Sequence, residues 1–238
     1  YSDSFGGTAQ QTTTAGTPDK PVPNVIVNNF SYGDGTGAVA SGSTFPLTFA
    51  FTNTSTSLTV ENLVVSVDTG DQFTINGGTN TFYSAYLAAG DVQQQTINLK
   101  SISSDKATPG TVTIGFKYEY VENNERKSAN TEVKLTVPVY QPDRFELADP
   151  VGPDMASVGE EATVTLSYVN KGKAAVSNVA VSISGDGITT STPEQNVGNI
   201  ESGKSGAIGL AFTPVQSGTL NLTLTVEYEN ANDETVTK

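Results

Sequence analysis

The chain has 238 residues, with 25 acidic and 12 basic side chains and a formal net charge of −13. This excess of negative charge repels phosphate backbones and anionic membranes, so nucleic acid is not expected as a partner. Cysteine and histidine are both absent, which excludes disulfides, thiolate metal sites and catalysis by Ser-His-Asp or Cys-His arrangements.

The first segment, residues 1–21, is rich in Thr, Gly, Gln, Ala and Pro and has almost no large apolar side chain. Such a segment cannot bury enough apolar surface to offset the entropy of ordering, so we expect a flexible linker. It lacks the basic flank and the apolar stretch of a signal peptide, and no apolar run in the chain approaches the ~20 residues that span a bilayer. We therefore interpret the sequence as a mature or trimmed segment.

From residue 22 onward, short apolar stretches alternate with polar residues and are separated by Gly, Asn and Asp. In TVTIGFKYEY, which ends at Tyr120, every second residue from Val112 is apolar, so one face of this strand is predicted to be buried. A polar hairpin loop, VENNERK, separates it from a second alternating strand, NTEVKLTV. The whole of this region predicts β-strands.

The second half of the chain repeats the first. The segment FTNTSTSLTVENLVVSV, which starts at Phe51, corresponds to YVNKGKAAVSNVAVSI, which starts at Tyr168, and GTVTIGFKYEY corresponds to GTLNLTLTVEY. We place two units at residues 22–139 and 140–238, joined through the polar stretch YQPDRFELADPVGPD. About seven short strands in each unit predict an all-β protein of two tandem immunoglobulin-like antiparallel β-sandwiches.

The end of the second unit is shorter than its counterpart. The stretch ENANDETVTK stands where the first unit has a complete final strand, SANTEVKLTVPV. A half-formed last strand leaves a sheet edge open. We therefore expect the last strand to be truncated and the natural chain to continue beyond Lys238.

Four short motifs of the second unit define a resemblance. They are an aromatic-x-Asn-x-Gly turn at Tyr168, a V-x-N-V-x-V strand at Val176, a G-x-I-x-x-G turn ending at Gly203 and a P-x-x-x-G-T stretch leading to the last long strand. With these motifs the unit resembles bacterial cell-adhesion-related domains and similar S-layer-type immunoglobulin-like repeats. The resemblance implies extracellular, non-enzymatic modules on the cell surface, attached to a membrane or wall only through segments outside this chain.

Three aromatic residues, Phe82, Tyr83 and Tyr86, lie in the stretch GGTNTFYSAYLAAGD, which we interpret as a loop of the first unit with no counterpart in the second. Aromatic side chains on a loop can stack on sugars or anchor a protein partner. The alternative is that they cap the core. If they are exposed, they form the predicted ligand patch.

Four acids in the connecting stretch, Asp143, Glu146, Asp149 and Asp154, form the best candidate for a metal site. An interdomain calcium ion would neutralise them and stiffen the joint. The alternative is a solvated linker, and we expect folding to require neither metal nor any other cofactor. Neighbouring acids elsewhere, such as Asp68 with Asp71, lie at strand ends and are not predicted to be catalytic.

The sequence therefore predicts no enzyme but a tandem immunoglobulin-like segment of a bacterial cell-surface protein, acting as an adhesive or spacer module. Its expected partner is a host or cell-surface protein or a glycan. Two alternatives stay open: a carbohydrate-binding module, which requires an exposed planar set of aromatic side chains, and the extracellular part of an anchored transporter-associated protein.

Overall fold

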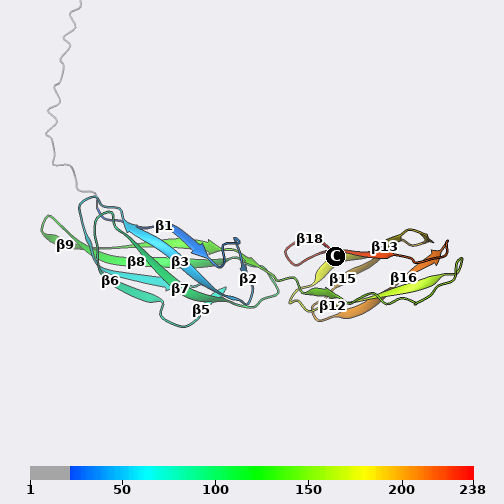
Figure 1. Cartoon of the computed structure of the whole chain (residues 1–238). Coiled ribbons are helices and arrows are strands. Elements are labelled where there is room, and N and C mark those ends of the chain that lie inside the picture. Colours follow the sequence, from blue (N-terminus) through cyan, green and yellow to red (C-terminus); the bar gives the residue numbers. More distant parts are fainter. Residues whose placement is uncertain (1–21) are drawn as a thin grey trace, which may run out of the picture.

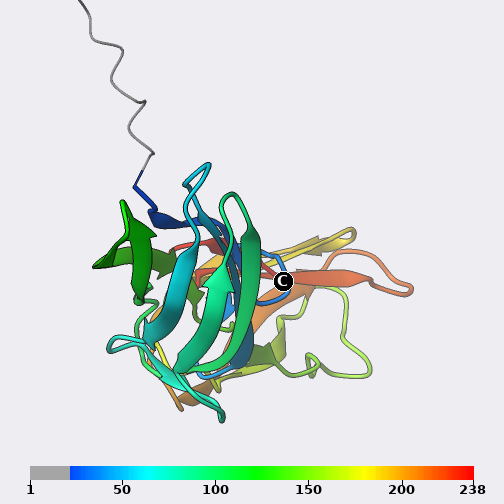
Figure 2. The same cartoon turned by 90° about the vertical axis from the view of Figure 1, so that its left-hand side faces the viewer.

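The computed structural model describes residues 22–238, and the predicted linker at residues 1–21 lies outside this range. Every regular element within the described range is a β-strand, which confirms the all-β prediction. The strands form two sandwiches that lie end to end along one long axis (Figure 1). Figure 2, a view turned by 90°, brings the first sandwich to the front.

The first sandwich consists of two four-stranded antiparallel sheets. One sheet contains, in spatial order, β1 (Val25–Tyr32), β3 (Thr44–Asn53), β7 (Val92–Ser101) and β5 (Phe73–Ile75). The other contains β6 (Thr81–Leu87), β4 (Val60–Asp68), β8 (Gly110–Glu122) and β9 (Glu125–Val137).

The second sandwich has the same strand order. One sheet contains β11 (Phe145–Leu147), β12 (Ala162–Asn170), β16 (Ser205–Pro214) and β14 (Ile188–Thr189). The other contains β15 (Glu194–Ile200), β13 (Val176–Gly185), β17 (Leu222–Glu229) and β18 (Thr235–Thr237). Both units are thus immunoglobulin sandwiches with one additional strand, β6 or β15, at the edge of the second sheet.

The connection between the sandwiches contributes a small parallel pair of its own. Strand β10 (Val139–Tyr140) pairs with β2 (Val39–Ala40) of the first sandwich. The predicted division between residues 139 and 140 falls inside β10, and the position of this division stays a prediction.

The alternation of apolar and polar residues in the sequence determines which face of each strand is buried. In β8, Ile114 and Phe116 are buried while Lys117 points to solvent, so the predicted core face of this strand is confirmed. Strands β8 and β9 are joined by a hairpin whose central residues, Asn123 and Asn124, have φ values of 50° and 64°. A two-residue hairpin turn of this kind requires positive φ at both positions, which asparagine tolerates better than most residues.

Each sandwich has its own hydrophobic core. In the first, Phe51 of β3 packs against Phe116 of β8, with ring centroids 5.2 Å apart. In the second, Phe145 of β11 packs edge-on against Tyr228 of β17, at 4.8 Å and 63°. Because these contacts join strands of opposite sheets, they hold the two layers of each sandwich together.

A buried asparagine ends strand β3 of the first sandwich. Asn53 is 0% exposed and terminates β3. Its side-chain oxygen accepts a hydrogen bond from the N–H of Ser55 (3.0 Å), and its side-chain nitrogen donates to the carbonyls of Leu58 (2.8 Å) and Leu87 (3.0 Å). Leu87 ends β6 in the opposite sheet, so this one side chain links the two sheets.

Asn170 makes the equivalent contacts at the end of β12 and is 1% exposed. Its oxygen accepts from the N–H of Gly172, and its nitrogen donates to the carbonyls of Ala174 and Ile200, all at 2.9 Å. A buried amide is costly to desolvate unless such bonds are made, so the side chain fixes one path for the turn.

The hydroxyl of Tyr228 donates a hydrogen bond to Asp143, which precedes β11. Burial, followed by the bond to this carboxylate, raises the pKa of Tyr228 well above its usual range. The folded protein therefore keeps this phenol protonated at pH values at which a solvated tyrosine ionises.

Replacing Asn170 with alanine removes three hydrogen bonds and leaves the N–H of Gly172 and two carbonyls without this partner. We expect the second sandwich to lose about 2–4 kcal/mol in its free energy of unfolding, measured by urea titration. The control is Asn221→Ala, since Asn221 is exposed and makes no side-chain hydrogen bond in the described structure. A control variant as unstable as Asn170→Ala would contradict this account.

The raised pKa of Tyr228 predicts a loss of stability in alkali. An unfolded tyrosine ionises near pH 10 and the folded one does not, so its contribution is complete below about pH 10 and declines as the pH rises further. Tyr228→Phe keeps the ring and removes the ionisation. Above about pH 10 we expect its free energy of unfolding to fall less steeply than that of the wild type, by up to about 1.4 kcal/mol per pH unit. Parallel pH profiles of the two proteins would refute this assignment.

Candidate functional site

The three aromatic residues predicted to form a ligand patch lie on a strand. The sequence prediction of a loop without counterpart is wrong, because residues 81–87 form strand β6 and β15 occupies the same place in the second sandwich. Tyr83 and Tyr86 are 64% and 73% exposed. Phe82 is half-buried and packs against the core. The structure thus brings two of the three side chains to the surface and assigns the third a packing role.

A bulge in the neighbouring strand explains why both tyrosines face solvent. Residues three apart on a regular strand point to opposite faces. In β4, however, Val60 and Leu63 are both fully buried, because Asn62 between them has a φ of 49° and inserts a bulge. Strand β6 stays paired with β4 through this bulge, and Tyr83 and Tyr86 emerge on the same outer face.

Hydrogen-bonding side chains lie beside these rings. The hydroxyl of Tyr83 donates to the side-chain oxygen of Asn62 (2.9 Å), and the side-chain nitrogen of Asn62 donates to Glu119 (2.6 Å). Arg126 forms ion pairs with Glu119 (3.1 Å) and Glu61 (2.8 Å), and these bonds, led by the one to Glu61, raise its pKa. The network orients polar groups next to two exposed aromatic rings.

A shallow hollow of about 500 Å³ adjoins this network. It is lined by residues of β4, β8 and β9, among them Asn62, Lys117, Glu119, Ser128 and Asn130. We define the tyrosine face as Tyr83 and Tyr86 together with Asn62, Glu119 and Arg126. Exposed rings beside amide and charged groups suit a ligand that offers both an apolar face and hydroxyl groups.

In the second sandwich the equivalent face has no aromatic side chain. Val64 of β4 pairs with Tyr83, and the equivalent residue of β13, Ala180, pairs with Asn196. Asn199 stands in the place of Tyr86, one residue before the last residue of its strand. The tyrosine face is therefore a property of the first sandwich alone.

The four acids of the predicted calcium site are not brought together. Asp143 accepts hydrogen bonds from Tyr228 and from the N–H of Phe145 (3.0 Å). Glu146 forms an ion pair with Lys171, with an N–O distance of 2.5 Å.

The other two acids, Asp149 and Asp154, are exposed. Across residues 22–238 no group of three or more acidic side chains has the arrangement of a metal site. Asp143 instead holds the start of the second sandwich through its bonds to Tyr228 and to the N–H of Phe145, and a calcium ion held by all four acids does not fit this geometry.

A buried glutamine at the junction was not found by sequence reasoning. Gln141 is 3% exposed. Its side-chain nitrogen donates to the carbonyls of Ser104 (2.5 Å) and Lys106 (3.1 Å) in the first sandwich. Its backbone N–H donates to the side-chain oxygen of Asn232 (2.9 Å) in the second, and the side-chain nitrogen of Asn232 donates back to its carbonyl (2.8 Å).

This residue therefore fastens the connection to both sandwiches at one point. The only local signal is its place between Tyr140 and Pro142, in a stretch that otherwise reads as exposed. Burial of Gln141 depends on the docking of two units, which no local pattern reports.

The described residues contain no helical segment of the length and hydrophobicity that a membrane crossing requires.

Two of the solved structures that are similar to this chain illustrate the likeness. Red sea bream transglutaminase is 14% identical, with a TM-score of 0.30, over 84% of this chain and 28% of that one. The YadV chaperone is 13% identical, with a TM-score of 0.26, over 90% of this chain and 97% of that one. The chain thus spans little more than a quarter of the transglutaminase, and neither likeness bears on its activity.

The family comparison concerns the second sandwich. No curated protein matches the chain. Residues 141–238 match the model of the CARDB family, which comprises immunoglobulin-like, cell-adhesion-related domains without enzymatic activity. This match covers less than half of the chain and agrees with the predicted immunoglobulin-like, adhesion-related character of that part.

Proposed function

We propose that this chain is a non-catalytic tandem segment of a bacterial cell-surface protein and acts as a spacer or adhesive module outside the cell. The observation that carries the proposal is the junction at Gln141, which is hydrogen-bonded to both sandwiches. A spacer has to resist bending at its joints. The match of residues 141–238 to a family of adhesion-related domains supports the same function.

The arrangement of the sandwiches suits this task. They lie end to end (Figure 1), so each added unit extends the molecule along its long axis. The parallel pair of β10 and β2 and the buried side chain of Gln141 leave little of the connection free to act as a hinge. A binding surface at one end is then held at a fixed distance from the other.

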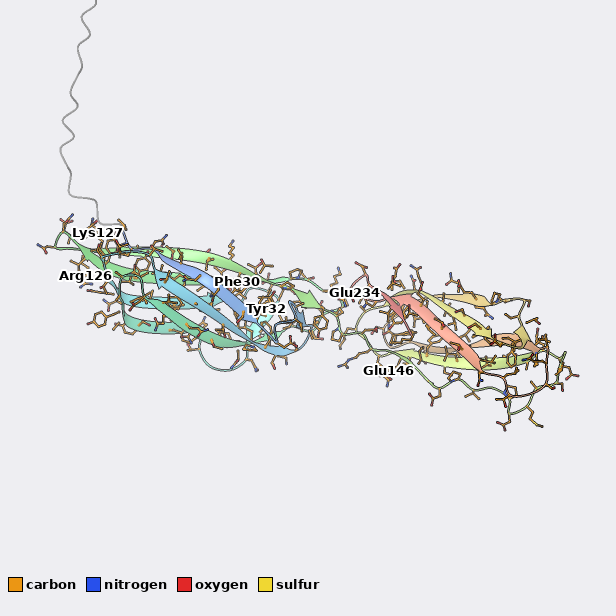
Figure 3. All side chains as sticks on the ribbon, turned by 45° about the horizontal axis from the view of Figure 1, so that its top comes forward. Phe30, Tyr32, Arg126, Lys127, Glu146 and Glu234 are labelled. Atoms are coloured by element: carbon orange, nitrogen blue, oxygen red, sulfur yellow. The ribbon has the colours of Figure 1, made fainter. Side chains whose placement is uncertain are left out.

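A second candidate function, carbohydrate binding, is favoured by the tyrosine face. Tyr83 and Tyr86 supply two exposed rings on one side of a sheet, and Asn62, Glu119 and Arg126 supply hydrogen-bonding groups next to them. Figure 3 places Arg126 near the end of the first sandwich that faces away from the second. A spacer that carries a glycan-binding face at its outer end is an adhesin, so the two functions are compatible.

The spacer function predicts a single, narrow distance between the sandwiches. The chain lacks cysteine, so spin labels can be attached at Gln94→Cys and Thr223→Cys, two exposed strand positions. We expect double electron–electron resonance to give one narrow distance distribution for this labelled protein. Adding Gln141→Ala and Asn232→Ala removes the junction hydrogen bonds and broadens the distribution.

The control for this experiment is Gln216→Ala, a change of an exposed glutamine in the second sandwich with no side-chain hydrogen bond in the described structure. This variant should keep the narrow distribution. A broad distribution in the protein with the junction intact would argue against a spacer.

Carbohydrate binding predicts that the tyrosine face can be disabled without unfolding the protein. We expect Tyr83→Ala with Tyr86→Ala to weaken glycan binding by about tenfold or more, because two stacking rings are lost. The free energy of unfolding should change by less than about 1 kcal/mol, since both side chains are exposed. Binding is measured by titration with the glycans that an array identifies.

The matched control for the tyrosine face is Phe30→Ala, because Phe30 is an exposed aromatic on β1 in the other sheet of the same sandwich (Figure 3). This variant should bind as the wild type does. An array without bound glycans, or an equal loss in the Phe30 variant, would exclude this second function.

A further inference from the structure

A cleft of about 530 Å³ lies where the two sandwiches meet. Residues of both sandwiches and of the connection line it, including Ser41, Ser103, Gln141 and the turn at residues 171–173. We call this hollow the junction cleft. Its volume lies within the range of small-ligand sites.

The junction cleft concentrates positive charge in a strongly acidic chain. Within residues 22–238, four basic residues line it and no acidic residue does. The four are Lys100, Arg144, Lys171 and Lys173. With a net charge of −13, a chain that distributed its charges evenly would give any hollow an acidic lining. The opposite lining here points to a negatively charged occupant.

Most of this charge has no partner within the described part of the chain. Lys171 pairs with Glu146, but these side chains are 57% and 54% exposed, and such pairs contribute little because water screens them. Residues 22–238 provide no ion pair for Lys100, Arg144 or Lys173. Figure 3 places Glu146 at the end of the second sandwich nearest the first.

The backbone that carries these cations is held in place. The N–H of Lys171 donates to the carbonyl of Arg144 (3.0 Å), and the N–H of Gly172 donates to the side chain of Asn170 (2.9 Å). The turn that bears Lys171 and Lys173 is therefore fixed to the residue that bears the arginine. Lys100 lies on β7, where it pairs with β3 and β5.

Hydroxyl groups complete the lining. The side chain of Ser41 accepts a hydrogen bond from the N–H of Ser104 (3.2 Å), which ties β2 to the loop after β7. Ser41, Ser103 and Thr74 all line the junction cleft. Hydroxyls, a guanidinium and ammonium groups together form a donor set for oxyanions: arginine binds two oxygens at once, and lysine contributes point charges.

We propose that the junction cleft binds a sulfate or phosphate group, carried by a surface glycan or present as the free anion. This inference goes beyond the spacer function and uses none of the residues of the tyrosine face. Since the cations come from both sandwiches, the bound group also strengthens the junction. Binding should weaken as salt is added, because exposed charges are screened over about 8 Å at physiological ionic strength.

The test is calorimetric titration of the whole chain at low ionic strength with sodium sulfate, sodium phosphate, a sulfated oligosaccharide and its desulfated form. The double variant Arg144→Gln with Lys173→Gln should bind at least about tenfold more weakly than the wild type. The control, Lys127→Gln with Lys134→Gln, changes the net charge by the same amount on strand β9 and should retain wild-type affinity. All four side chains are exposed, so both variants are expected to fold, and circular dichroism verifies this.

Tight binding of the sulfated oligosaccharide alone identifies a glycan as the source, and equal binding of the simple salts identifies the free anion. Amide chemical-shift changes confined to residues 41–42, 100–103 and 171–173 would support the location. No binding of any anion, or an equal loss of affinity in the two double variants, would overturn the proposal.

Discussion

The hydrogen bonds of one buried asparagine in each sandwich determine how the two sheets are joined. Asn53 and Asn170 end equivalent strands and bond to the turn that follows and to the last residue of β6 or β15 in the opposite sheet. Loss of such a side chain leaves several buried backbone groups unpaired, which costs more than the bonds themselves contribute. The path of the chain at this end of each sandwich therefore follows from a single amide.

The hydrogen bonds of Asn53 and Asn170 also determine which turn lies at that end of each sandwich. The turn after Asn53 lies next to Asn24 at the start of the first sandwich, through the bond from Thr54 (2.9 Å). The equivalent turn after Asn170 carries Lys171 and Lys173 and lines the junction cleft. Because the units follow one another head to tail, the same structural turn faces solvent in one unit and faces its neighbour in the other. The side chains of this turn can therefore differ between the two units, and serve different roles, without any change in the fold.

Sequence patterns predicted the strands and the fold class well, because alternation in β8 and its neighbours reports directly on burial. They failed where burial depends on backbone irregularity or on docking. The bulge at Asn62 in β4 breaks the alternation of burial at Tyr83 and Tyr86 of the paired strand β6, so the sequence of β6 lacks the pattern of a regular strand and suggests a loop. Gln141 is polar and follows an exposed tyrosine, and nothing local shows that two sandwiches enclose it. The acids of the connection are conspicuous in the sequence, yet Asp143 bonds to Tyr228 and to the N–H of Phe145, and Glu146 pairs with Lys171, so they do not form one metal site.

The central claim is that the two sandwiches form one stiff body through the junction at Gln141. Residual dipolar couplings of backbone amides in the unmodified chain, measured in a dilute alignment medium, test this directly. A stiff junction predicts one alignment tensor, with equal magnitude and direction for both sandwiches. A clearly weaker tensor for one sandwich than for the other would mean that the units reorient independently, and the account would be contradicted.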